Sequence, residues 1–368
     1  MGINQGPEDG KIKSGKQQKA KPEPLRKEKG IIQSDYACAL ETLEGNDVPE
    51  NEVRILLLGV DGSGKSTVRN LILGNDTFKT DEPSRGKTRT SSYATCVRNG
   101  RRFVVVETPC LFHTRFAPKF IITEVNKLIG LTLPGPHICI FVVPSVDLSS
   151  EEKQAMARMQ SAFFPGAADN SMVALTKIDV LSPKGMSPEA YASGAAVVIK
   201  KIIEKCNNRV VHLGLTNGKE EDELQTKNLV DVIESMLDKN SNKFYTNEAY
   251  ALAQVNMKVH KTQLKEKYLR TEAGISLLEK MKNVEGMRSR KKTDENVSNA
   301  TPAEETLEKM ESGLKTLTES MTEVVCDQVR EGVLQESITP FELNLRRLIT
   351  SGTKSIGSFL ASFISFGP

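Results

Sequence analysis

Residues 59–66 read Gly-Val-Asp-Gly-Ser-Gly-Lys-Ser, which fits the phosphate-loop pattern G-x-x-x-x-G-K-[ST] without a break. An apolar run, Val53–Leu58, precedes this stretch, and a helix-forming run over residues 66–73 follows it. The order strand, glycine-rich loop, helix separates a working phosphate loop from a chance match. The alternative, an ordinary glycine-rich turn, leaves the Lys-Ser pair without a purpose. The stretch therefore predicts an α/β fold that binds a nucleoside triphosphate.

Each residue type in this loop has a physical reason to be there. The glycines let the backbone curl so that successive N–H groups point at phosphate oxygens, and the following helix adds the positive end of its dipole. Lys65 is expected to neutralise charge on the β- and γ-phosphates, and Ser66 to offer its hydroxyl to Mg²⁺. The candidate nucleotide-binding residues of the loop and the helix start are Gly59, Asp61, Gly62, Ser63, Gly64, Lys65, Ser66 and Thr67.

Composition narrows the class of protein. The chain has 368 residues, enough for an α/β domain and a second region. Its net charge of +3 is too small for a nucleic-acid signature, so no specific nucleic-acid partner is expected. The six cysteines are scattered and fit a reducing compartment. With no apolar signal-peptide core and no apolar run of about 20 residues, we expect a cytoplasmic location, including peripheral attachment to an intracellular membrane.

Strand and helix patterns alternate between residues 51 and 241, which predicts a mostly parallel sheet with helices on both faces. The expected strands are Val53–Leu58, Tyr93–Arg98, Arg102–Val106, Ile138–Val143, Met172–Thr176 and Arg209–Leu213. The expected helices cover about 66–74, 118–131, 149–163, 188–206 and 225–240. Asn99-Gly100 is a hairpin turn signal, so Tyr93–Arg98 is expected to be an edge strand. The predicted fold class is a P-loop NTPase of the Ras-like G-domain type, followed by a C-terminal helical extension.

The regions on either side of residues 51–241 have a different composition. Residues 1–50 form a basic leader that we expect to be mostly disordered. In the extension, residues 242–368, the runs 244–285 and 303–335 are charged and helical, with a polar break over Arg288–Pro302. Their heptads are irregular for a coiled coil. The final segment, Phe341–Phe366, is amphipathic; packing against protein and contact with a membrane interface both remain open for it.

A second motif indicates the base. Thr176-Lys177-Ile178-Asp179 stands at the end of an expected strand, about 110 residues after the phosphate loop. Guanine presents two adjacent donors, N1–H and the exocyclic amine, and one carboxylate can accept both. Adenine has a ring acceptor at the same place. Asp179 therefore predicts guanine selectivity, with the stem of Lys177 lying over the purine ring.

Three further stretches resemble the immunity-associated GTPases, the GIMAP family with its AIG-type G domain, which is similar to septins and to chloroplast import GTPases. Pro134-Gly135-Pro136-His137 resembles the family's box before a core strand. Residues 104–114 resemble its switch II, usually V-V-I-D-T-P-G-L-F-D-T. Phe244-Tyr245-Thr246-Asn247-Glu248 resembles the segment after its last G-domain helix. The resemblance covers about residues 51–250 and leaves the basic leader and most of the extension outside.

The resemblance implies roles for further residues. Thr88 matches the switch I threonine that senses Mg²⁺ and the γ-phosphate, so the implied metal ligands are Ser66 and Thr88. Lys177 and Asp179 would read the base, and Thr216-Asn217 would add a further base contact. The implied cofactor is Mg²⁺, with GTP or GDP as the ligand. The implied partners are other G domains, in a homo-oligomer or hetero-oligomer.

Two residues depart from the family pattern in switch II. Glu107 stands where the family has Asp, and Cys110 stands where it has Gly. Both belong to the candidate nucleotide contacts, Glu107 through Mg²⁺ and Cys110 through its backbone near the γ-phosphate. No glutamine follows to orient a hydrolytic water. His113 is the nearest candidate catalytic residue, against the alternative of a solvent-exposed loop histidine.

Together these observations predict a guanine-nucleotide-binding protein that assembles in a GTP-dependent way and hydrolyses GTP slowly or with a partner's help. One alternative is an interaction scaffold whose nucleotide is structural and is not turned over. Another is a P-loop protein that uses ATP, since the phosphate loop alone does not select a base.

Overall fold

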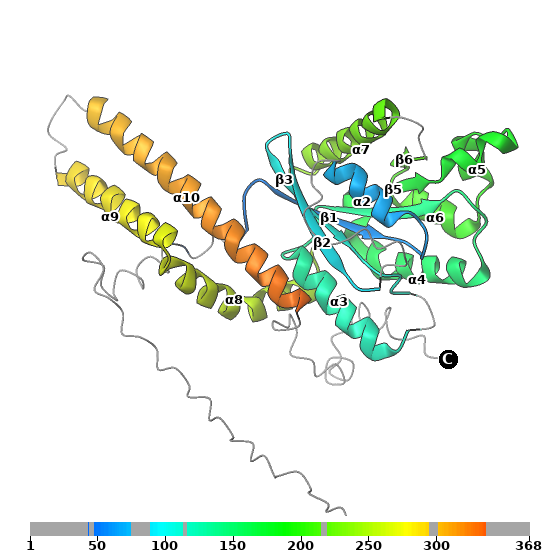
Figure 1. Ribbon diagram of the computed structural model, residues 1–368, viewed down its shortest axis with the longest axis horizontal. Coiled ribbons are helices and arrows are strands. Elements are labelled where there is room, and N and C mark those ends of the chain that lie inside the picture. The colour runs from blue at the N-terminus through cyan, green and yellow to red at the C-terminus, as the bar shows by residue number, and fades with distance from the viewer. Residues whose placement is uncertain are drawn as a thin grey trace, which may run out of the picture.

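Six strands of the described residues form a single sheet in the order β2-β3-β1-β4-β5-β6 (Figure 1). They are β1 (Glu52–Leu58), β2 (Ser92–Arg98), β3 (Arg101–Glu107), β4 (Ile138–Pro144), β5 (Ser171–Thr176) and β6 (Val210–His212). The computed structural model describes residues 43, 48–74, 89–112, 116–214, 219–293 and 301–335. Most of the basic leader and the whole of Phe341–Phe366 lie outside these residues.

The sheet has the predicted mixed pattern. β2 runs antiparallel to β3 at the edge, joined by the turn at Asn99-Gly100, where both residues have positive φ. All other neighbouring strands are parallel. The predicted strands and the edge position of Tyr93–Arg98 are confirmed. Because parallel strands end at the same side, the loops after β1, β3, β4, β5 and β6 meet at one edge of the sheet.

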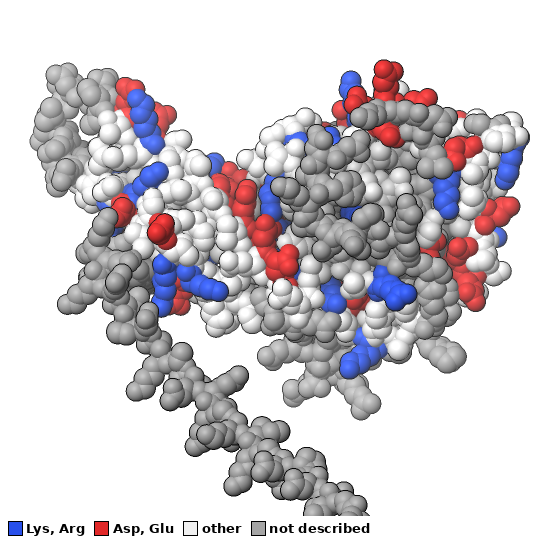
Figure 2. Space-filling model, in the orientation of Figure 1, with Lys and Arg blue, Asp and Glu red and all other residues white. Residues whose placement is uncertain are grey.

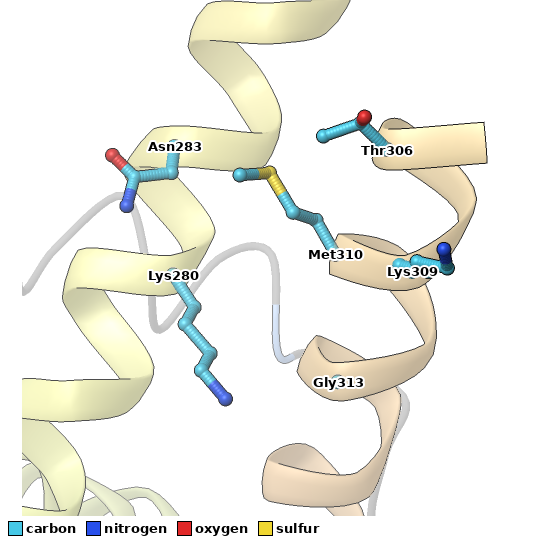
Figure 3. Close-up of a pocket in the computed structure, with 6 residues that line it drawn as sticks. All are labelled: Lys280, Asn283, Thr306, Lys309, Met310 and Gly313. Carbon is cyan, nitrogen blue, oxygen red and sulfur yellow. The ribbon is translucent and has the colours of Figure 1, made fainter. Parts of the chain in front are cut away.

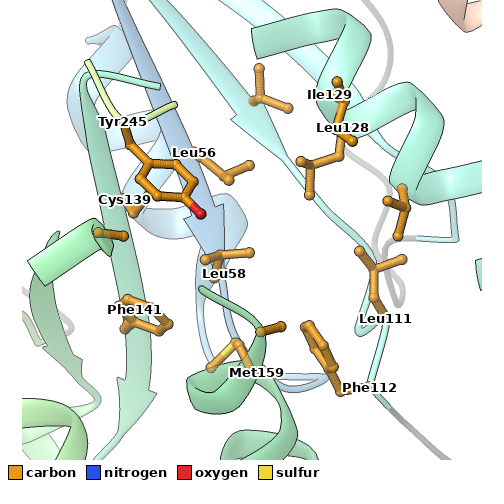
Figure 4. Close-up of a cluster of buried hydrophobic side chains, with 14 of the residues drawn as sticks. Leu56, Leu58, Leu111, Phe112, Leu128, Ile129, Cys139, Phe141, Met159 and Tyr245 are labelled. Atoms are coloured by element: carbon orange, nitrogen blue, oxygen red, sulfur yellow. The ribbon is translucent and has the colours of Figure 1, made fainter. Parts of the chain in front are cut away.

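Helices cover both faces of the sheet. On one face lie α2 (Lys65–Leu73) and α7 (Lys219–Lys239), which pack on β1 residues such as Ile55 and Leu57. On the other lie α3 (Pro118–Thr132), α4 (Ser150–Ala167) and α6 (Val197–Lys205), next to the short α5 (Pro188–Gly194). Alternate residues of each buried strand serve the two faces, so Leu56 and Leu58 contribute to the second core (Figure 4).

After α7, the described residues form three further helices: α8 (Glu248–Leu269), α9 (Glu272–Thr293) and α10 (Thr301–Leu334). α9 and α10 lie side by side as an arm that projects to the left of the α/β part in Figure 1. Between them lies a cavity of about 350 Å³, lined by Lys280, Asn283, Thr306, Lys309, Met310 and Gly313 (Figure 3). Leu43 packs into the arm's own apolar cluster with Leu278 and Met321.

The extension shares its core with the sheet. Tyr250 and Ala253 of α8 and Val329 and Val333 of α10 are buried in the cluster that also holds the β1 and β4 side chains. The hydroxyls of Tyr250 and Thr132 lie 2.7 Å apart, which joins α8 to α3. The near end of α10 therefore packs as part of the α/β body.

A buried ion pair anchors α10 to the beginning of β1. The guanidinium of Arg330 donates to Glu52 at 2.6 Å, and both side chains are almost fully buried. Arg102 joins the same carboxylate at 2.8 Å and also pairs with Asp327 of α10 at 2.6 Å. Burial by itself raises the pKa of Glu52, but the charge and hydrogen bond of Arg330, together with Arg54 and Arg102, lower it to about 2.

The predicted helix 188–206 is wrong in its extent, and the predicted helical run 244–285 consists of two helices, because the chain turns inside both. The run 188–206 is divided between α5 and α6, because Ala195 and Ala196 after Gly194 adopt extended backbone. The run 244–285 is divided at Thr271, whose hydroxyl caps α9 by accepting from the N–H of Gly274 at 3.2 Å. A Cβ on Gly274 would lie 2.2 Å from the Tyr268 carbonyl oxygen, so this turn needs glycine there.

The predicted polar break over Arg288–Pro302 begins too early. α9 continues to Thr293, and Arg288 pairs with Glu311 of α10 at 2.7 Å. Part of the charged stretch that looks like a linker in the sequence is thus helical and contacts α10. Figure 2 shows basic and acidic side chains interspersed over the visible face. Of the helices described, none combines the length and the apolar character needed to cross a bilayer.

Candidate nucleotide site

The phosphate loop connects the end of β1 to the start of α2. Gly62 and Gly64 have positive φ, 68° and 96°, which glycine adopts without strain. A Cβ on Gly59 would approach the Val142 carbonyl oxygen to 2.6 Å, so the loop passes directly over β4. Gly64 has no side chain to cap α2, and the first turn of the helix carries no acidic residue. The first N–H groups of α2 are therefore suited to an anion.

Lys65 is buried beneath this loop. Its ammonium group donates to the carbonyl oxygens of Gly59 and Val60, each at 3.0 Å. Burial lowers the pKa of Lys65, while Cys110, Glu107 and Asp61 act in the opposite direction. The positive charge is thus held within the loop by the loop's own backbone.

Ser66 and Glu107 come together from different elements. The Ser66 hydroxyl at the start of α2 donates to Glu107 Oε1 at 2.6 Å, and Glu107 ends β3 beside Leu57 of β1. The other carboxylate oxygen pairs with Arg69 at 3.1 Å. A hydroxyl and a carboxylate that meet at a phosphate loop are the oxygen ligands that Mg²⁺ prefers. The residues present therefore fit a nucleotide with its magnesium ion.

Cys110 is buried three residues after Glu107. The next two residues, Leu111 and Phe112, insert into the core, and Figure 4 shows Phe112 beside Met159 of α4. Thr108 is also fixed, since its hydroxyl donates to the Leu57 carbonyl at 2.9 Å. Cys110 is not one of the described residues with positive φ. The segment 107–112 is thus held by its own apolar side chains in a backbone that tolerates a Cβ.

The segment predicted to recognise the base, Thr176–Asp179, stands at the end of β5. Lys177 is exposed and has positive φ, 58°, which turns the chain into a short 3-10 helix that contains Asp179. The Ile178 N–H donates to Leu213 O at 3.2 Å, and a Cβ on Gly214 would lie 3.4 Å from Asp179 Oδ1. The chain after β6 therefore passes directly beside the carboxylate expected to read guanine.

A threonine joins the two motifs. The Thr176 hydroxyl donates to the Ser63 carbonyl oxygen at 2.6 Å and lies 3.3 Å from the Val143 carbonyl. Gly64 also faces Thr176, since a Cβ on Gly64 would lie 3.4 Å from the methyl group of Thr176. The first residue of the base motif thus supports the phosphate loop, and Asp179 is placed relative to that loop within three residues.

Several predicted site residues lie outside the described residues. They are Thr88, His113, Thr216 and Asn217. The structure therefore brings together the phosphate-loop residues Gly59–Ser66 with Glu107, Cys110 and the Lys177–Asp179 segment. Thr67 is exposed on α2, one residue beyond Ser66.

Sequence reasoning missed three residues of this site. Thr176 belongs to a motif in which only Lys177 and Asp179 have predicted roles, so its support of the phosphate loop was not predicted. Arg69 is three residues beyond Ser66, a spacing that places both on one side of the helix, and this spacing was the available signal. Gln225 of α7 brackets Gly214, accepting from its N–H at 3.0 Å and donating to its carbonyl at 3.3 Å. Nothing local in the sequence marks that contact.

The Pro134–His137 box lies at the opposite end of the strands from the phosphate loop. His137 Nδ1 accepts from the Arg54 N–H at 3.0 Å, and its ring packs edge-on against Phe244. Tyr245 donates its N–H to Pro136 at 2.8 Å, while a Cβ on Gly135 would lie 1.8 Å from the Tyr245 carbonyl oxygen. The two stretches, 134–137 and 244–248, therefore contact one another and have a structural role.

Comparison with known proteins identifies the family to which the chain belongs. A family model described as the AIG1 family matches residues 53–265. "Immune-associated nucleotide-binding protein 9" of Arabidopsis thaliana is 31% identical over 202 residues, covering 53% of this chain and 58% of that protein. "GTPase IMAP family member 8" of Rattus norvegicus is 26% identical over 186 residues, covering 50% of this chain and 26% of that protein.

Among solved structures, Toc33 from Arabidopsis thaliana in complex with GDP and Mg²⁺ aligns with a TM-score of 0.40 and 16% identity, over 58% of this chain and 94% of that one. The chain spans 58% and 63% of the length of the first two curated relatives. The matched residues 53–265 include the sheet apart from Glu52, the phosphate loop, the Thr176–Asp179 segment and most of α8. This chain belongs to the AIG1 family.

Proposed function

We propose that this chain is a guanine-nucleotide-binding protein that takes GTP or GDP together with Mg²⁺. The observation that carries the proposal is the bond between Thr176 and Ser63, because it places the base motif and the phosphate loop on one rigid support. Asp179 at the end of this support accepts the two adjacent donors of guanine. The names of the curated relatives, immune-associated nucleotide-binding proteins and a GTPase, support the same ligand class.

The residues divide the work at the phosphates. The N–H groups around Gly62 and Gly64 and the start of α2 bind phosphate oxygens, and Lys65 supplies a positive charge. Ser66 holds Mg²⁺ through its hydroxyl and Glu107 through its carboxylate. When bound, the ion neutralises phosphate charge. Thr88, Thr216 and Asn217 remain proposed contacts to the metal and the base.

Equilibrium titration with GTP, GDP and ATP tests this proposal. The chain should bind both guanine nucleotides at least about 10-fold more tightly than ATP, since ATP leaves Asp179 unpaired. Lys65→Ala should weaken binding of all three. Equal affinity for ATP would favour the alternative of an ATP-using P-loop protein. Binding that Lys65→Ala leaves unchanged would place the ligand elsewhere.

We further propose that GTP promotes assembly of two G domains across the nucleotide face, and that hydrolysis is slow or assisted by the partner chain. The support comes from the segment after β3. Residues 108–112 contain no glutamine to orient a water, and His113 is the nearest candidate. Mass by light scattering should rise in a GTP analogue relative to GDP. Single-turnover hydrolysis should accelerate with protein concentration.

A second candidate function is a scaffold whose bound nucleotide is structural. It is favoured by the fixed position of Glu107, which is already bonded to Ser66 and Arg69, and by the burial of Leu111 and Phe112. A segment held in this way changes little when the γ-phosphate is lost. Identical mass in GDP and GTP analogue, with no turnover, would support the scaffold and exclude GTP-driven assembly.

Location and membrane contact form the last part of the proposal. We propose a cytoplasmic protein whose segment Phe341–Phe366 either packs against protein or lies at a membrane interface. Liposome flotation of the chain with and without residues 341–368 tests this. Loss of flotation on truncation would support membrane contact through this segment, and equal flotation would exclude it.

A further inference from the structure

Arg69 contacts Glu107, a candidate Mg²⁺ contact, although Arg69 belongs to none of the sequence motifs. It lies three residues after Ser66, so both side chains project from the same side of α2. The guanidinium is 3.1 Å from Glu107 Oε2, while Ser66 donates to Oε1 at 2.6 Å. One carboxylate therefore receives a hydroxyl on one oxygen and a positive charge on the other.

The surroundings make this ion pair strong. Only 2% of the Glu107 side chain and 22% of the Arg69 side chain are exposed, so water screens the pair poorly. Arg69 is also oriented by Asn70, whose Oδ1 accepts from its Nε at 3.4 Å. An arginine keeps its positive charge at every pH at which proteins are folded. Arg69 therefore brings a positive charge into direct contact with Glu107.

The length of Glu107 is what allows the contact. An aspartate at the same position would be one methylene shorter and would sit further from both Ser66 and Arg69. A second cation brought to Glu107 is repelled by the guanidinium, and a nucleotide bound at the phosphate loop without metal would still have a positive charge at Glu107. Arg69 therefore lowers the affinity of the site for Mg²⁺ and raises its affinity for the metal-free nucleotide.

We propose that Arg69 is a resident counter-cation for Glu107, which lets the chain bind guanine nucleotide with little dependence on Mg²⁺. The inference rests on the proposed function and concerns the same site. Arg69 is a positioning residue that acts through Glu107. By linkage, whatever Arg69 removes from the affinity for Mg²⁺ it equally removes from the gain in nucleotide affinity that Mg²⁺ provides.

The test compares the affinity for a fluorescent GDP derivative in excess Mg²⁺ and in EDTA. For the wild-type chain the affinity should fall less than about 10-fold on removal of Mg²⁺. In Arg69→Gln the ratio of the two affinities should widen by about 10-fold, through weaker binding in EDTA. Arg69→Lys keeps the charge and should restore most of the wild-type ratio.

The matched control is Arg101→Gln. Arg101 is a half-buried arginine at the opposite end of β3, paired with Glu234 at 3.3 Å, so its loss removes one positive charge without touching the site. It should leave the ratio unchanged. Glu107→Asp is a second route to the same result, because the shorter side chain withdraws from Arg69; it should widen the ratio even if Arg69→Gln fails to fold.

Two failures are distinguishable. If the wild-type chain binds no GDP in Mg²⁺, the proposed function is wrong and the inference fails with it. If GDP binds and its Mg²⁺ dependence is the same in the wild type, Arg69→Gln and Arg101→Gln, the inference alone is overturned.

Discussion

The Thr176 hydroxyl donates to the Ser63 carbonyl oxygen at 2.6 Å, which joins the end of β5 to the phosphate loop. Thr176→Val keeps the shape of the side chain but leaves that buried carbonyl without its donor, at a cost of about 1–3 kcal/mol. Calorimetry should show GTP and GDP binding weakened about 10-fold, with the preference for guanine over adenine unchanged.

Two variants control this result. Thr176→Ser retains the hydroxyl and should bind within about threefold of the wild type. Thr322→Val removes a buried hydroxyl that donates to the Thr318 carbonyl oxygen within α10, far from the loop, and should leave affinity unchanged. A Thr176→Val chain with wild-type affinity would show that the bond does not position the loop.

Gly135 belongs to the structural contact between residues 134–137 and 244–248. Gly135→Ala would put a Cβ 1.8 Å from the Tyr245 carbonyl oxygen, so one of the two segments must move. We expect a loss of about 3 kcal/mol or more in the free energy of unfolding, measured in urea. Gly194→Ala, where a Cβ meets no atom within 4 Å, is the control and should change stability by less than about 1 kcal/mol. Equal effects would contradict the assigned contact.

Arg330 holds α10 against β1 through the buried pair with Glu52. Arg330→Met removes this partner and leaves Glu52 buried with Arg54 and Arg102, for which we expect a loss of about 3 kcal/mol in stability. Arg288→Met breaks the exposed pair with Glu311 and should cost less than about 1 kcal/mol. Denaturant unfolding measures both. If the two substitutions cost the same, the buried pair does not anchor the helix.

His137 makes stability depend on pH. Burial, reinforced by the charge of Arg54, lowers the pKa of His137 to about 3, whereas a histidine in the unfolded chain has a pKa near 6.5. The unfolded chain therefore takes up a proton that the folded chain refuses, and stability falls as the pH drops from about 6.5 towards 3. Between pH 6.5 and 5 this amounts to about 2 kcal/mol.

Urea unfolding at pH 7, 6 and 5 checks this prediction. His137→Asn can still accept from the Arg54 N–H, but it loses the buried ring, so its stability at pH 7 should be lower. Because asparagine does not titrate, the stability of this variant should vary less between pH 7 and pH 5. Glu52, whose pKa is about 2, contributes only at lower pH, when its unfolded-state carboxylate begins to protonate near 4.5. An unchanged slope in His137→Asn would assign the pH dependence to another group.

Much of the fold could be predicted from the sequence because the strongest sequence signals depend on residues that are close together in the chain. The phosphate loop, the buried strands and the hairpin at Asn99-Gly100 depend on neighbours in the chain, and the structure has them where periodicity placed them. Asp179 could be predicted as a base contact because its motif is contiguous with a strand end, and β5 does end at Thr176.

What the sequence did not reveal depends on residues far apart in the chain. Arg330 and Glu52 are 278 positions apart, and Thr176 and Ser63 are 113 apart. No pattern within one helix or strand indicates such a pair. The single helix expected over 188–206 and the helical run 244–285 are each interrupted for another reason: helices end after Gly194 and begin after Thr271 through backbone turns that average helix propensity does not register.

We propose that the Asp179 carboxylate selects guanine by accepting from N1–H and the exocyclic amine. The most direct measurement is the affinity of the wild-type chain and of Asp179→Asn for GTP and for xanthosine triphosphate, whose base carries an oxygen where guanine carries its amine. An asparagine amide can donate to that oxygen while accepting from N1–H, so the variant should prefer the xanthine nucleotide and the wild type the guanine nucleotide, each by at least about 10-fold. If the preference is the same in both chains, Asp179 does not contact the base and the account of this site is wrong.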